Sequence, residues 1–108
     1  MGDPLAEKTF VDKFVEVKEL VRTVDVRAGD ADYRLEIYRN YSNAQTPYVV
    51  HCFVRRKVLR SEPEFKGQTI DALSLDGSLL ERGASPEQAL ARALGFLHDR
   101  HRRRARRG

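Results

Sequence analysis

The sequence predicts an α+β fold, a two-layer sandwich in which an N-terminal and a C-terminal helix pack on one face of a three- to four-stranded antiparallel sheet. Three observations support this prediction. Apolar residues recur at helical spacing near the N-terminus, they alternate with polar residues in the middle of the chain, and a strong helix-capping pattern begins at Ser85. The predicted order of elements is therefore α-β-β-β-α, or the same order with a fourth strand.

The first predicted element is a helix over residues 5–21. Asp3 can cap this helix, and Pro4 suits its first position because the fixed backbone angle of proline matches a helix. An apolar stripe follows at helical spacing and consists of Ala6, Phe10, Phe14, Val17, Val21 and Val24. Valine lowers helix propensity, so a strand over residues 15–28 is the alternative for this region.

The central part of the chain changes to a period of two, which is typical of strands with one buried face. This alternation runs through DYRLEIYRN, residues 32–40, and YVVHCFVRRKVL, residues 48–59. The apolar face of the second segment consists of Val50, Cys52, Val54 and Val58. Further on, IDALSL and SLLERG flank Asp76-Gly77, a dipeptide that favours a two-residue hairpin turn. The sequence therefore predicts two long strands followed by a hairpin.

The last predicted element is a helix that begins after Ser85. The Ser85 hydroxyl can cap it, Pro86 suits its first position, and Gln88 completes a capping box with Ser85. Its apolar stripe consists of Leu90, Ala93, Leu94 and Leu97. Both predicted helices need an apolar partner surface, so we expect them to cover the same face of the sheet.

At 108 residues the chain is expected to form one domain over residues 1–97, followed by an Arg-rich tail over residues 98–108 that is expected to be disordered. The formal net charge is +4. The tail holds six arginines and one aspartate, which gives +5, so the rest of the chain carries −1. Any affinity for nucleic acid is therefore expected to be added to the fold by the tail.

The cysteine count and the hydropathy pattern favour a cytoplasmic protein without membrane association. Cys52 is the single cysteine, so an internal disulfide is excluded and a reducing compartment fits. The chain contains no apolar run of about 18 residues, the length that a membrane-spanning helix needs.

The chemistry-bearing residues do not form a pattern typical of an enzyme. His51 and Cys52 are neighbours on a strand, so their side chains point to opposite faces and cannot form a catalytic pair. His98 and His101 lie three residues apart among arginines, whose positive charge opposes a metal cation. The glycines are isolated, so no phosphate-binding loop is expected. We therefore expect no catalysis, no metal, no cofactor and no small-molecule substrate.

Two sets of residues are candidates for binding nucleic acid. The first is the polar face of the two long strands, which interleaves aromatic and basic side chains suited to stacking on bases: Arg34, Tyr38, His51, Phe53, Arg55 and Lys57. The second is the tail, whose arginines can attract phosphates: Arg100, Arg102, Arg103, Arg104, Arg106 and Arg107. The alternative for both sets is an ordinary solvated face and a solvated chain end.

The predicted order of elements resembles the double-stranded-RNA-binding domain. In that family the last strand leads through glycine and serine into a helix with the run Ser-Lys-Lys-x-Ala-Lys. Gly83, Ser85, Ala89 and Ala93 fall at matching positions here, while Pro86, Glu87 and Leu90 replace the three lysines that contact phosphates in the family. The resemblance implies an α-β-β-β-α fold and an RNA partner.

The segment GASPEQA, residues 83–89, is similar to the strand-to-helix signature G-x-T-x-E-E-A of HicB-like antitoxin domains. Ser85 stands for the threonine and Gln88 for the second glutamate. This resemblance implies a regulatory domain that binds a small ribonuclease.

Two functions follow as hypotheses from these observations. The first is a small non-enzymatic module that associates with RNA or DNA through the arginine tail and the aromatic-basic sheet face. The second is a protein-interaction module, antitoxin-like or a homodimer, that uses the sheet face or an edge strand.

Overall fold

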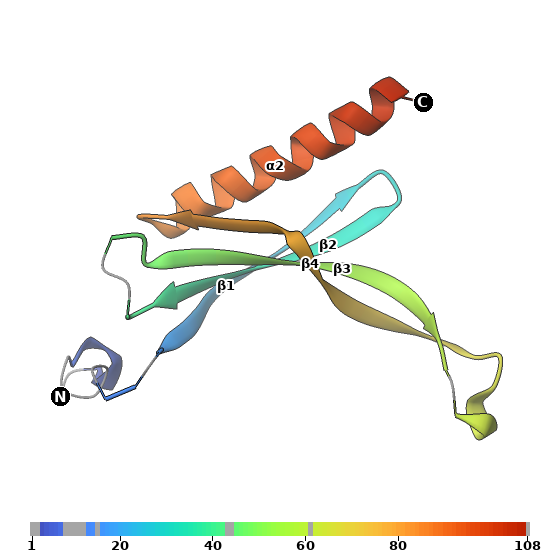
Figure 1. Ribbon diagram of the computed structural model, residues 1–108, viewed down its shortest axis with the longest axis horizontal. Helices are drawn as coiled ribbons and strands as arrows, with labels where there is room; N and C mark the ends of the chain where they lie inside the picture. The colour runs from blue at the N-terminus through green and yellow to red at the C-terminus, as the bar shows by residue number, and fades with distance from the viewer. Residues whose placement is uncertain (1–2, 8–12, 15, 43–44, 61, 108) are drawn as a thin grey trace.

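The structure is a computed structural model that describes residues 3–7, 13–14, 16–42, 45–60 and 62–107 (Figure 1). It contains a four-stranded antiparallel sheet whose strands follow one another in sequence order, and one long helix on one face of that sheet. The elements are η1 (Pro4–Ala6), β1 (Lys18–Ala28), β2 (Ala31–Asn40), β3 (Tyr48–Leu59), η2 (Pro63–Phe65), β4 (Thr69–Gly83) and α2 (Pro86–Arg107). The α+β class is therefore confirmed, but the order α-β-β-β-α is wrong: the chain is β-β-β-β-α.

The N-terminal helix predicted over residues 5–21 is absent from the described part of that segment. Asp3 does accept a hydrogen bond from the Leu5 backbone and Pro4 does start a helical turn, but this turn is the single 3-10 turn η1. Residues 18–28 form β1, which agrees with the alternative of a strand. The valines explain the outcome, because their branched side chains fit a pleated strand better than a helix. Residues 8–12 and 15 lie outside the described residues.

The hairpin turn predicted at Asp76-Gly77 is also wrong, because β4 continues through it. The pairing of β3 with β4 shifts between His51↔Leu80 and Phe53↔Leu75. An advance of two residues along β3 corresponds there to five residues along β4. The extra residues form a bulge. Asp76 stabilises it locally by accepting hydrogen bonds from the backbone N–H and the hydroxyl of Ser78. An Asp-Gly pair suits a bulge as well as a turn, and here the long β3 partner decides between them.

The core lies between α2 and the sheet. Its buried side chains come from β2, β3, β4 and one stripe of the helix: Tyr33, Leu35, Ile37, Val50, Cys52, Leu79, Ala89, Ala93 and Leu97. This confirms the predicted inward face of the two long strands at Leu35, Ile37, Val50 and Cys52. Gly83 allows the close approach of helix to strand, since a Cβ on it would lie 2.7 Å from the backbone nitrogen of Ala89.

The start of α2 confirms the predicted cap. The Ser85 hydroxyl accepts a hydrogen bond from the Gln88 backbone, and the Gln88 side chain accepts one from the Ala84 backbone. This reciprocal pair satisfies two backbone donors at the helix start.

The end of α2 differs from the expectation of a separate, disordered tail from residue 98. The helix continues without interruption to Arg107. Two of its side chains in this region contact the sheet: Arg100 forms an ion pair with Asp76, and His101 forms a hydrogen bond with the Tyr33 hydroxyl. The helix therefore runs across residue 97, and the sheet supplies partners to the turn that follows.

The β3–β4 hairpin extends beyond the rest of the sheet. The pairing of β2 with β3 ends at Tyr33↔Val54, so Arg55–Leu59 pairs only with Thr69–Leu73. We call residues 55–73 the arm; Figure 1 shows it leaving the sheet on the side away from α2. No described residue of the arm is buried. An isolated two-stranded ribbon has little stability of its own in water, so the arm depends on its connection to the rest of the sheet.

Candidate binding surfaces

The sheet face turned away from α2 is the first candidate surface, and we call it the open face. No described helix covers it (Figure 1). The strand register places the predicted aromatic-basic residues on this face, with Arg34 opposite Phe53 and Glu36 opposite His51. Tyr38 follows on the same face, two residues beyond Glu36. The parity that the sequence predicted for these strands is therefore correct.

The half of the open face formed by β3 and β4 carries exposed leucines beside Phe53. Leu75 lies opposite Phe53, Leu80 opposite His51, and Leu73 opposite Arg55. The exposed fractions are 61% for Leu75, 52% for Leu80 and 41% for Leu73. Adjacent exposed leucines beside a phenylalanine are uncommon on a monomer and are typical of a surface that contacts another molecule. We call Phe53, Leu73, Leu75 and Leu80 the leucine strip.

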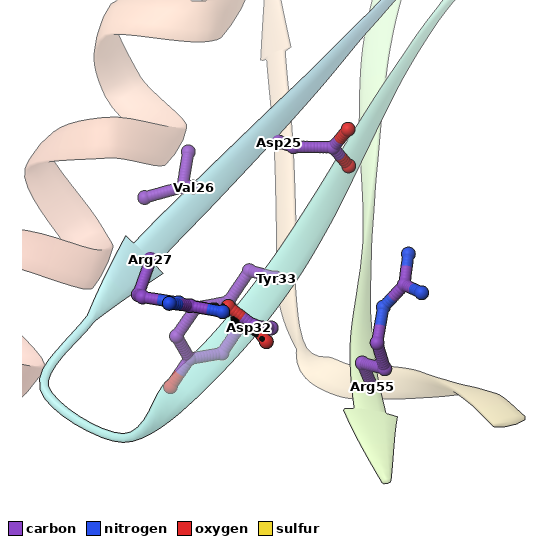
Figure 2. A pocket seen from close by; sticks show the side chains of 6 residues that line it. All are labelled: Asp25, Val26, Arg27, Asp32, Tyr33 and Arg55. Atoms are coloured by element: carbon purple, nitrogen blue, oxygen red, sulfur yellow. Dashed lines mark hydrogen bonds and ion pairs between the residues drawn. The ribbon is translucent and has the colours of Figure 1, made fainter. Parts of the chain in front are cut away.

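The half formed by β1 and β2 carries charges that neutralise one another (Figure 2). Arg27 binds Asp32 through two hydrogen bonds of 2.7 and 3.3 Å, and the Nε of Arg34 lies 3.2 Å from Asp25. The hydrogen bond from Arg27 lowers the pKa of Asp32 below its ordinary range, and the nearby charge of Arg55 acts in the same direction. Asp25, Arg27, Asp32 and Arg55 line a hollow of about 340 Å³. The two acids, Asp25 on β1 and Asp32 at the start of β2, were not among the residues that the sequence predicted for this face.

Tyr38 and His51 contact each other and charged neighbours on this face. The Tyr38 hydroxyl donates a hydrogen bond of 2.8 Å to Glu36, which raises the pKa of that hydroxyl. The ring of Tyr38 meets the ring of His51 edge-on, with centroids 5.5 Å apart. Partial burial and the nearby charge of Lys18 lower the pKa of His51, which disfavours the positively charged form of this histidine on the open face.

The second candidate surface lies where the arm leaves the sheet and where α2 ends. Arg55, Arg56 and Lys57 are exposed on β3, and Arg102 and Arg103 are exposed on α2. For the three β3 residues the described part of the chain contains no ion pair, and Arg102 has only a contact of 3.8 Å with Asp99. We call these five residues, with the helical positions Arg104, Arg106 and Arg107, the basic end. Figure 1 shows the helix end and the arm extending from the same side of the sheet and diverging from each other.

Arg100 was predicted to bind nucleic acid, but it has a structural partner. Its Nη1 lies 2.6 Å from Asp76 Oδ2, its Nη2 donates to the Ser78 hydroxyl, and its guanidinium lies over the Phe96 ring at 4.9 Å. Burial alone would raise the pKa of Asp76, but the hydrogen bonds from Arg100 and Ser78 outweigh it and the pKa is lowered. This cluster joins the helix to the β4 bulge. The sequence offered no signal for it, because residues 76 and 100 are brought together only by packing.

Other chemistry is sparse in the part of the chain that the structure describes. No group of three or more His, Cys, Asp or Glu side chains there could hold a metal ion. Cys52 is buried in the core, and this burial raises the pKa of its thiol to about 11. No helix among the described residues has the length and apolar character to cross a membrane.

Among the described residues, the fold is a small antiparallel sheet with one helix on one face and no helix on the other. No protein-family model matches the chain, and no curated protein or solved structure matches it either.

Proposed function

We propose that this chain is a small non-enzymatic module that associates with nucleic acid through its basic end. The supporting observation is the set of exposed basic side chains on β3 and α2: Arg55, Arg56, Lys57, Arg102 and Arg103. Acids lie near two of them, Asp32 near Arg55 and Asp71 opposite Lys57, but the described residues form no ion pair with Arg55, Arg56 or Lys57. Phosphate backbones recognise such a surface without regard to sequence, because each contact releases a bound counterion. The chain carries a net charge of +4 and the basic end holds eight basic residues, so the rest of the chain carries −4 and does not attract phosphates by its net charge.

The helical state of residues 98–107 strengthens this proposal. Arginines at positions 102, 103, 104, 106 and 107 include several pairs spaced three or four residues apart, and like charges at these spacings destabilise a helix. The negative end of the helix dipole offsets part of that repulsion. A polyanion bound along the helix would offset the rest. The basic end is therefore better suited to a phosphate backbone than to water alone.

The aromatic-basic open face contributes less than the sequence suggests. Arg34 already has a carboxylate partner in Asp25, and the lowered pKa of His51 disfavours its positive charge. Arg55 and Lys57 keep their exposed charge and lie at the root of the arm, so they join the basic end. Phe53 lies beside leucines, which suit a protein partner better than a phosphate backbone.

The test measures binding of single- and double-stranded RNA and DNA over a range of salt concentrations. Each of the five arginines after His101 is replaced by glutamine, which keeps helix propensity and removes the charge. We expect binding at low salt by the wild type and its loss in this variant. Deleting the chain from residue 98 would be a poorer test, because it also removes the contacts of Arg100 and His101 with the sheet.

A matched pair of variants controls for total charge. Arg102→Gln with Arg103→Gln removes two charges from the basic end, and Lys13→Gln with Arg22→Gln removes two exposed charges near the N-terminal end of the sheet. The first pair should reduce the salt dependence of log Kd by about 1 for each arginine removed, and the second should leave it unchanged. No binding by the wild type, or equal loss in both pairs, would overturn the proposal.

A protein-interaction module is the second candidate function, and the leucine strip is the observation that favours it. Its leucines are exposed, adjacent and on one face, whereas the charged half of that face is satisfied by its own ion pairs. An apolar centre beside a polar margin is the usual composition of a protein interface.

A further inference from the structure

We propose that the leucine strip of the open face binds the same strip of a second copy of this chain, so that two open faces pack against each other in a two-fold homodimer. This inference gives the second candidate function its partner. It does not require nucleic-acid binding, because the basic end and the leucine strip consist of different residues, although they adjoin where Arg55 lies opposite Leu73.

The first argument is the surface area of the single chain. Its accessible surface is 7959 Å². A compact monomer of 12.4 kDa exposes about 6,100 Å². The chain therefore exposes roughly 1,800 Å² more than expected, while a stable interface of standard size buries about 800 Å² on each partner. The excess is large enough to supply one such interface.

The second argument is the shape of the chain. The radius of gyration is 17.7 Å, against about 13 Å for a compact domain of this length. The molecule is only 22 Å thick along its shortest axis and 51 Å long. One helix on one face of an extended sheet, together with a protruding arm, gives these dimensions (Figure 1). A second layer on the open face would turn this thin shape into a compact one.

The third argument is the distribution of polarity on the open face. The leucine strip lies on β3 and β4, and the ion pairs Arg27–Asp32 and Arg34–Asp25 lie on β1 and β2. A two-fold axis parallel to the strands, between β3 and β4, places each leucine strip on the other. The ion-paired halves then lie at the two outer margins, where water reaches them. The ion pairs of the β1–β2 half therefore stay unburied in this arrangement. Arg55, opposite Leu73, lies at the end of the strip beside Asp25 and Asp32.

The same distribution selects against other partners. A nucleic acid would have to contact leucines and charges that are already neutralised, so the strip offers it little. In a second copy, an identical leucine strip can cover the apolar side chains of the first. Isologous two-fold contacts of this kind are the most common form of oligomer. Sheets packed face to face at a spacing of about 10 Å bury side chains of this size between them.

The experiment measures molar mass by light scattering and sedimentation over a wide range of concentrations. The wild type should approach twice the 12.4 kDa mass of one chain. Leu75→Asp places a charge at the centre of the strip, and we expect it to raise the dimer Kd by about thirtyfold or more. Leu94→Asp is the matched control, because Leu94 is an exposed leucine on α2, away from the open face. We expect this variant to dimerise like the wild type. Circular dichroism verifies that both variants are folded.

Each outcome decides a different point. A wild type that stays monomeric at all concentrations, or a Leu75→Asp variant that stays dimeric, overturns the second copy as the occupant. Loss of the dimer in Leu94→Asp but not in Leu75→Asp assigns the interface to the helix layer and overturns the open face. A monomer that binds another purified protein through Leu75 overturns this inference but leaves the second candidate function intact. A monomer whose RNA or DNA binding is lost in Leu75→Asp assigns the open face to nucleic acid.

Discussion

At the scale of single residues, the contact between Asp76 and Arg100 is the clearest link between helix and sheet. The side chains of Asp76 and Arg100 are only 13% and 19% exposed. A charge that is this far buried depends on its partner, because water can replace little of the lost interaction. This pair therefore stabilises both the β4 bulge and the last turns of α2.

Asp76→Asn keeps the size of the side chain and removes its charge. We expect the free energy of unfolding to fall by about 2 kcal/mol, the usual scale for a hydrogen bond with a charged group. The folded-state pKa of Asp76 lies below its ordinary value of 3.8, so the stabilisation is present above about pH 4 and is lost as the pH falls through the folded-state pKa. Denaturant unfolding at a series of pH values from about 2 to about 7 measures this dependence. A wild type and a variant that differ by the same amount at both extremes would contradict the assignment.

At the scale of elements, local signals decided the two central strands and the start of α2. Tertiary pairing decided the state of residues 18–28 and of Asp76-Gly77. The Ser85–Gln88 cap is a local interaction and was predictable. The segment 18–28 satisfies a helical stripe and a strand alternation at once, and its pairing with β2 selects the strand. The Asp76-Gly77 dipeptide fits a turn or a bulge, and the length of β3 selects the bulge.

Gly95 gives a prediction at this scale. It lies on the exposed side of α2, and a Cβ built on it meets nothing within 4 Å. Gly95→Ala should therefore stabilise the protein by up to about 1 kcal/mol, because alanine loses less backbone entropy in a helix. Thermal unfolding, with the molar mass measured in parallel, tests this. A lower melting temperature or a weaker dimer would show instead that a partner approaches the helix closely at this position.

At the scale of the whole molecule, the two proposed surfaces are separate and would act together. A homodimer that joins the open faces carries two basic ends. Two linked sites bind a long nucleic acid more tightly than a single site, by about a hundredfold or more where both can be engaged at once.

The combined effect is measurable with nucleic acids of different length. Leu75→Asp leaves every arginine in place, so its binding to a short oligonucleotide should equal that of the wild type. On a long duplex the wild type should bind much more tightly than the variant, because only the dimer can engage two sites. Equal affinities on the long duplex would contradict a cooperating dimer, while leaving the charge-based binding of a single chain in place.

The sequence by itself determined the α+β class, the two central strands with their inward and outward faces, the capped C-terminal helix and the location of the positive charge. Each of these depends on residues that are neighbours along the chain, through spacing, capping or composition. Only the tertiary structure decided that residues 18–28 are a strand, that β4 runs through Asp76-Gly77, that Arg100 is held by Asp76, and that leucines share the open face with Phe53. The reason is physical: these outcomes depend on partners distant in sequence, and the local preferences of the residues permit more than one answer until those partners are in place.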